Sequence, residues 1–291
     1  MKFSEDFHMA DKVALPTIWH IPDDLWNVME QLLPPAKPSG SVGRPRLSPR
    51  RVLDGILYVM RTGCQWKAVP REYGSGSSIH RYFQRWVEQH LFEQLWAILL
   101  EYYDTNVGIA WTWQAADATM LKAPLGGTLC GPNPTDRGKS GTKRSVLADQ
   151  RGAPLSVVLA GANRHDMRLL EPTLAAIVTE RPSPKSYKQH LCLDKGYDYP
   201  ECDATVSDYG YIGHIRRKGE APVPAENRTH APKRWIIECV HSWHNRFRKV
   251  MVRYEKKDWN YLGLVDFASA LIVYRIIYRY SSRAKPNRVL G

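Results

Sequence analysis

The spacing of the apolar residues changes near Ile109, and this change limits the fold more than any other feature of the sequence. Before it, apolar side chains recur at the three- and four-residue intervals of amphipathic helices. After it, they come in short runs that alternate with helical stretches, which is typical of a sheet covered by helices. We therefore expect an all-helical part over 1–106 and an α/β part over 107–291.

The helical part has clear start and stop signals. A first helix is predicted over 22–33, and prolines break the pattern directly after it. Ser48 is a suitable N-cap, Pro49 suits the first helical position, and Gly63 is a suitable stop for a second helix. After a Gly/Ser turn, one long helical pattern continues to about residue 104.

The second part reads as a mixed sheet with flanking helices. Short apolar runs predict buried strands at 111–116, 145–148, 154–160, 191–193 and 211–215. Helical patterns predict helices over 167–178, 200–209, 235–252 and 261–280. Asp266 and Arg275 interrupt the apolar stretch of the last helix, so we expect it to lie in the core and not in a membrane.

The charge balance points to a polyanionic partner. The chain has 41 Lys and Arg against 29 Asp and Glu, a net charge of +12, and nucleic acid is the commonest partner of such a surplus. Five scattered cysteines do not suggest a disulfide framework. Residues 1–11 contain acids and no apolar segment, so we expect a cytosolic protein without a signal peptide.

Two features of the helical part suit DNA. Residues 77–86 follow a glycine turn, as the second helix of a helix-turn-helix does, and offer possible DNA contacts from His80, Arg81, Gln84 and Arg85. The alternative is an ordinary solvated helix face. Arg44 and Arg46 flank Pro45 in an extended segment that would suit a minor groove, or that is simply a charged linker.

Three acids stand in positions that suggest a shared site. Asp117 ends the predicted strand over 111–116, and Asp194 ends the run over 191–193. Strand ends beside loops are where α/β folds place ligand chemistry, although aspartate at such points is also a common cap or turn residue. Glu238 lies on a predicted helix.

At 100° per residue, apolar side chains gather on one side of that helix. The other side collects polar residues, namely Arg234, Glu238, His241, Ser242, Asn245 and Lys249. Carboxylates at 117, 194 and 238 could together hold two hard cations, Mg²⁺ or Mn²⁺, for phosphoryl transfer.

Other clusters are open to more than one interpretation. The loop over 136–144 carries Arg137, Lys139, Lys143 and Arg144, which we expect to face DNA, the alternative being a solvated hairpin. His165 and Asp166 could form an acid/base pair, but a turn into the next helix is the simpler interpretation. A zinc site with Cys239 is disfavoured because closely spaced cysteine pairs are absent from the sequence.

Several ordered motifs resemble one family, the DDE transposases of bacterial insertion sequences in the four/five superfamily, over nearly the whole chain. The segments that carry the resemblance are 19–26, 43–46, 63–66, 117–123, 131–139, 162–166, 194–198, 234–238 and 245–248. This resemblance implies a ribonuclease-H-like domain preceded by a helix-turn-helix-like domain. It also implies a catalytic and metal-binding triad of Asp117, Asp194 and Glu238 with two Mg²⁺ or Mn²⁺ ions.

The implied activity is cleavage at the terminal inverted repeats of an element, followed by joining of the 3′ ends to target DNA. Arg234 would contact DNA phosphate. Relatives often carry a basic residue seven places after the glutamate, where this chain has Asn245 followed by Arg246, and by the helical wheel Lys249 is the better-aligned cation. Two ends cut in concert imply a homodimer on DNA, in a cytoplasmic, nucleoid-associated protein without membrane contact.

Two other functions fit the same residues. A catalytically silent relative would bind DNA as a regulator and cut nothing. A stand-alone metal-dependent nuclease would cut DNA without preference for element ends and would never join a 3′ end to a target.

Overall fold

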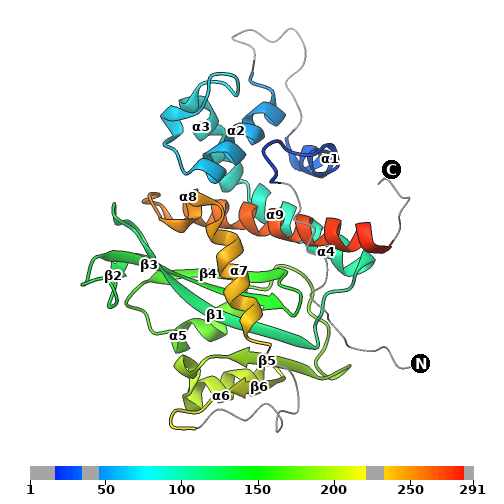
Figure 1. Ribbon diagram of the computed structural model, residues 1–291, viewed down its shortest axis with the longest axis vertical. Coiled ribbons are helices and arrows are strands. Elements are labelled where there is room, and N and C mark those ends of the chain that lie inside the picture. The colour runs from blue at the N-terminus through cyan, green and yellow to red at the C-terminus, as the bar shows by residue number, and fades with distance from the viewer. Residues whose placement is uncertain (1–16, 35–45, 221–232, 285–291) are drawn as a thin grey trace.

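The computed structural model describes residues 17–34, 46–220 and 233–284 (Figure 1). Five helical elements come first in the chain. They are α1 (Asp23–Leu32), α2 (Pro49–Thr62), the short η1 (Trp66–Ala68), α3 (Gly76–Glu88) and α4 (Leu91–Asn106). We refer to α1–α3 with η1 as the head, and these three helices form the upper part of the view in Figure 1. Helix α2 has the predicted limits, with Pro49 in its first turn and Gly63 in the left-handed conformation at its end.

Helices α3 and α4 replace the single long helix that the sequence pattern predicts. His90 has a φ of 56°, so the chain turns between the two helices although their apolar patterns run on. The break lets α3 bury Ile79, Phe83 and Trp86 in the head while α4 runs on toward the sheet.

A mixed sheet forms the centre of the second part of the chain. Its strands are β1 (Trp113–Lys122), β2 (Gly131–Pro132), β3 (Ser140–Asp149), β4 (Pro154–Gly161), β5 (Gln189–Leu193) and β6 (Tyr211–Ile215). The order across the sheet is β4-β3-β1-β5-β6, and β2 pairs with the first two residues of β3. The β1–β3 and β3–β4 pairs are antiparallel, whereas β5 and β6 follow β1 in parallel. The predicted α/β class is confirmed.

Helices cover both faces of this sheet. Helix α5 (Met167–Ala175) lies against one face, where Thr173 donates a hydrogen bond to Ser145 of β3. Helix α7 (Trp235–Asn245) lies across the other face, in contact with β1 and β3 (Figure 1). Helix α6 (Pro200–Asp208) follows the short η2 (Lys195–Tyr197) and packs beside β6.

The predicted helix over 235–252 is two helices in the structure. Helix α7 ends at Asn245, and α8 (Arg248–Met251) starts after Phe247, whose backbone is extended. This break changes the direction of every side chain beyond it, so the face assignment at 100° per residue fails for Lys249.

The last helix, α9 (Asp258–Ala284), joins the two parts of the molecule. It runs along α4 and also contacts α3, α8 and β4 (Figure 1). Residues 258–280 are long and apolar enough to cross a membrane, but 78% of the most apolar window is buried inside the protein. Apolar residues of the head, of α9 and of the sheet form one continuous core. The predicted core helix is confirmed.

Candidate active site

Asp117 and Asp194 occupy matching positions on neighbouring strands. Strands β1 and β5 are parallel, their last paired residues are Ala115 and Cys192, and each aspartate lies two residues farther along its strand. Adjacent strands are about 5 Å apart, so the two side chains lie close together on one face of the sheet. Asp117 does not end its strand as predicted, because β1 continues to Lys122 through pairing with β3.

The surroundings of Asp117 disfavour its ionised form. Burial first, and the negative charge of Asp194 after it, raise the pKa of the Asp117 carboxyl to about 6. A backbone hydrogen bond from Ala118, at 2.9 Å, and the charge of Arg234 act in the opposite direction. The Asp194 carboxylate accepts a hydrogen bond from the Gly196 amide at 2.7 Å, which fixes its direction at the end of the strand.

Glu238 lies on α7, the helix that covers the face of Asp117, but it faces Arg234. Its Oε1 atom lies 2.7 Å from Nη2 of Arg234 one turn earlier, and the Glu238 side chain is 57% exposed. In the described ranges, no group of three or more His, Cys, Asp and Glu side chains lies close enough to hold a metal ion. The structure therefore brings two of the three predicted carboxylates together and holds the third in an ion pair.

His241 lies beside Asp117, a position that sequence reasoning missed. Its Nε2 atom is 3.9 Å from Asp117 Oδ2, and the side chain is buried, although the helical wheel put it on the polar face. Burial, with the nearby charge of Arg144, lowers the pKa of His241 to about 3, so the ring is neutral. Only the position of His241 one turn after Glu238 could have indicated it.

Two of the loop cations predicted to face DNA are buried in β3 instead. Arg144 is fully buried on the α7 face, where one guanidinium nitrogen donates to Asn245 Oδ1 at 3.3 Å. Lys143 is buried too, with its ammonium 2.6 Å from Asp166. The expectation is wrong for these two residues because the strand starts at Ser140 and takes them into the sheet. Arg137 and Lys139 precede the strand and are exposed.

The cations expected after Glu238 are also arranged differently. The Lys249 ammonium lies 3.1 Å from Glu255 Oε1, and both side chains are almost completely buried. Lys249 is therefore not the DNA-facing cation that the helical wheel favoured. Asn245 is half-buried and Arg246 is exposed.

Of the residues of the head predicted to contact DNA, some are partly buried and others are exposed. The His80 ring stacks on Trp66 at 4.7 Å, and burial lowers its pKa, while Gln84 is half-buried. Arg46, Arg81 and Arg85 are exposed around one hollow. Arg44 lies outside the described residues. Ser78 and Tyr82 line the same hollow and were missed, although both lie on the helix face of Arg81 and Arg85.

His165 and Asp166 lie in a turn that leads into the next helix, which is the simpler of the two interpretations, and they do not form an acid/base pair with each other. His165 Nδ1 accepts the amide of Met167 at 3.3 Å in the turn that opens α5, and Asp166 binds Lys143.

Comparisons with known families match both parts of the chain. The family described as "Putative transposase of IS4/5 family" matches residues 21–96, and the family described as "Transposase DDE domain" matches residues 114–269. The second match contains Asp117, Asp194 and Glu238.

Two proteins of Burkholderia cepacia are similar in sequence. One is the "Putative transposase for insertion sequence element IS402", 30% identical over 157 residues, which are 51% of this chain and 70% of the relative. The other is the "Insertion element IS402 uncharacterized 16.2 kDa protein", 34% identical over 118 residues, which are 39% of this chain and 80% of the relative.

One solved structure with some likeness is the catalytic domain of the Mos1 mariner transposase. It is 12% identical, the superposition covers 64% of this chain and 90% of that one, and the TM-score is 0.27.

Proposed function

The chain belongs to the DDE-domain transposases, and we propose that Asp117, Asp194 and Glu238 form its catalytic centre. The observation that carries this proposal is the matched position of Asp117 and Asp194 on β1 and β5, inside the segment that matches the DDE domain. Glu238 stands on the helix that crosses the same sheet face and is paired with Arg234, and we infer that its side chain leaves Arg234 to join the two aspartates.

Membership of this family implies dependence on a divalent metal ion, and the residues fit such an ion. Carboxylate oxygens are the donors that Mg²⁺ and Mn²⁺ prefer. Burial raises the pKa of Asp117, and the negative charge of Asp194 adds to this effect, which a bound cation would offset. We propose two ions, held by Asp117, Asp194 and Glu238. When bound, they would activate the attacking oxygen and stabilise the leaving oxygen of phosphoryl transfer.

The chain's own residues would position these carboxylates and the DNA. The Ala118 and Gly196 amides orient Asp117 and Asp194 through hydrogen bonds, which leaves the remaining carboxylate oxygens for ligands. Arg234 would exchange Glu238 for a DNA phosphate, since a guanidinium binds phosphate with two parallel hydrogen bonds. Exposed Arg137, Lys139 and Arg246 would add backbone contacts.

The two parts of the chain would then have different roles in transposition. We propose that residues 1–106 bind the terminal inverted repeats and that residues 107–291 cut them and join the 3′ ends to target DNA, in a homodimer on the cytoplasmic chromosome. The family matches support this division because they end and begin at 96 and 114.

The decisive experiment uses a plasmid that carries the DNA flanking this gene. The protein, Asp194→Asn and the control Asp208→Asn, an exposed aspartate at the end of α6, are incubated with Mg²⁺ or EDTA, and the breaks are mapped. We expect breaks at inverted repeats that need both metal and Asp194. Shifted DNA without breaks would identify a silent DNA-binding relative, and breaks without end preference would identify a nuclease.

A further inference from the structure

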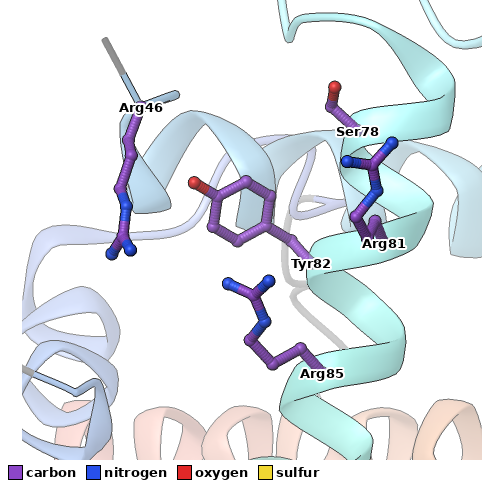
Figure 2. A pocket seen from close by; sticks show the side chains of 5 residues that line it. All are labelled: Arg46, Ser78, Arg81, Tyr82 and Arg85. Carbon is purple, nitrogen blue, oxygen red and sulfur yellow. The ribbon is translucent and has the colours of Figure 1, made fainter. Parts of the chain in front are cut away.

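The head carries a hollow of about 210 Å³ beside α3 (Figure 2). Its lining consists of Arg46, Ser78, Arg81, Tyr82 and Arg85. The last four lie three and four positions apart on α3 and so form one face of that helix. The opposite face holds the buried Ile79, Phe83 and Trp86, which fixes the direction of the polar face toward the outside.

The charges around this hollow are all positive. Three arginine side chains line it, and among the described residues no acidic side chain does. Placing like charges side by side is unfavourable unless an anion accompanies them. A guanidinium group can form two parallel hydrogen bonds with the oxygens of a phosphate or a carboxylate.

The lining side chains come from two parts of the head. Figure 2 shows Arg46, just before α2, across the hollow from Arg85 and the Tyr82 ring on α3, with Arg81 on the other side of Tyr82 beside Ser78. The Arg85 guanidinium carbon lies 5.8 Å from the centre of that ring, so the ring supports the arginine. Ser78 adds a hydroxyl near the start of α3, where the helix dipole also favours an anion.

We propose that this hollow is a cradle for a single backbone phosphate of the DNA that the head binds, and that it fixes the register of α3 on the duplex. The inference rests on the proposed function. A hollow of this size holds several waters of about 30 Å³ each, which is enough for one phosphate group with its two ester oxygens. Contacts to phosphate position a protein on DNA and carry no sequence information themselves.

The test measures binding of fluorescent duplexes from the DNA flanking this gene. Each duplex of the series carries one methylphosphonate, which removes the charge of one phosphate. For the wild type we expect one position to weaken binding about 10-fold and its neighbours to matter much less. Arg81→Ala and Arg85→Ala should bind the unmodified duplex about 10-fold more weakly, and should lose nothing further from the methylphosphonate at that position.

The salt dependence of DNA binding separates the effect of the arginine charge from that of the guanidinium geometry. Each alanine variant should lower the slope of log affinity against log salt by about one, because one phosphate contact is lost. Arg85→Lys should keep the slope but bind more weakly, since an ammonium lacks the planar fork. The matched control is Arg168→Ala, an exposed arginine on α5, which should leave the sensitive position unchanged.

Three results would overturn the cradle while leaving the proposed function standing. In the first, the alanine variants bind the duplex with the affinity of the wild type. In the second, the variants lose the same factor in affinity on every methylphosphonate duplex. In the third, micromolar inorganic phosphate saturates the wild-type protein, yet Arg81→Ala binds the duplex unchanged. Failure of the wild type to bind any duplex would instead contradict the proposed function.

Discussion

Asp117 and Asp194 stand side by side on parallel strands, each two residues past the pair formed by Ala115 and Cys192. The negative charge of Asp194 adds to the effect of burial in raising the pKa of Asp117 to about 6. The Asp194 carboxylate therefore makes ionisation of Asp117 less favourable as long as no cation lies between them.

Asp117→Asn should stabilise the metal-free protein at pH 7. The folded-state pKa of Asp117 lies above the unfolded value of about 3.9, so its ionisation penalty is absent below about pH 4 and complete above about pH 6. Removing the carboxylate should therefore raise the free energy of unfolding by about 1–2 kcal/mol at pH 7, and by much less at pH 4. Urea unfolding in EDTA measures this, and a variant less stable than the wild type at pH 7 would contradict it.

Added metal should make the wild type more stable than Asp117→Asn. A ligand that binds only the folded state raises its stability, so millimolar Mg²⁺ or Mn²⁺ should raise the Tm of the wild type. Asp117→Asn and Asp194→Asn should show little or no rise, and Asp208→Asn should behave like the wild type. Equal rises in all four proteins would place metal binding elsewhere on the chain.

His241→Leu should make the protein less sensitive to acid. The folded-state pKa of His241 is lowered to about 3, so its contribution is complete above the unfolded value of about 6.5 and is lost as the pH falls toward 3. Between pH 7.5 and 5 this loss is about 1–2 kcal/mol in the wild type, and the variant should lack it. Unfolding at both pH values measures the effect, with His20→Leu, an exposed histidine, as control. A wild-type loss that persists in His241→Leu would exclude this residue as its source.

Lys249→Met should destabilise the fold because it leaves the Glu255 carboxylate buried without its partner. Breaking a buried pair in this way costs about 3–5 kcal/mol, whereas replacing both partners by apolar residues is often nearly neutral. We therefore expect Lys249→Met/Glu255→Leu to recover much of the loss in urea unfolding. The control Lys256→Met removes an exposed lysine nearby and should change little. A single variant as stable as the wild type would mean that the pair is not buried in solution.

Arg234→Ala should affect cutting far more than stability. An exposed pair one turn apart on a helix, such as Arg234 with Glu238, contributes only about 0.3–0.5 kcal/mol to folding. The loss of one phosphate contact should nevertheless lower the rate of strand cleavage at least 10-fold while end binding persists. Arg234→Lys should recover part of the rate. Cleavage by the alanine variant at the wild-type rate would show that Arg234 does not meet the scissile strand.

Much of the fold follows from local patterns in the sequence. The apolar runs predict every strand except β2, which has only two residues, and they predict the helices of the sheet domain apart from the break at Phe247. These patterns succeed because burial on two faces of a sheet requires apolar runs whatever the rest of the chain does. The left-handed turn at His90 escapes prediction because its neighbours continue the helical pattern without a glycine.

The positions of charged side chains are harder to predict from the sequence. Asp117 and Asp194 could be paired in advance through the resemblance, whereas the burial of Arg144 and Lys249 depends on how α7, α8 and β3 meet. A helical wheel assumes one continuous helix, so a single extended residue at Phe247 invalidates it from that point on. Burial of a cation also depends on partners distant in sequence, such as Asn245 for Arg144.

The packing of α9 along α4 has a consequence for how the protein is made. The whole sheet and α7 are synthesised between these two helices, so α4 leaves the ribosome long before its main partner exists. Its apolar face, with Phe92, Leu95 and Leu99, must remain uncovered or shielded by other proteins during that interval. Contacts between such distant segments form slowly because a long loop must close first. A nascent chain is therefore unable to complete its core, and hence to act on DNA, until translation has passed α9.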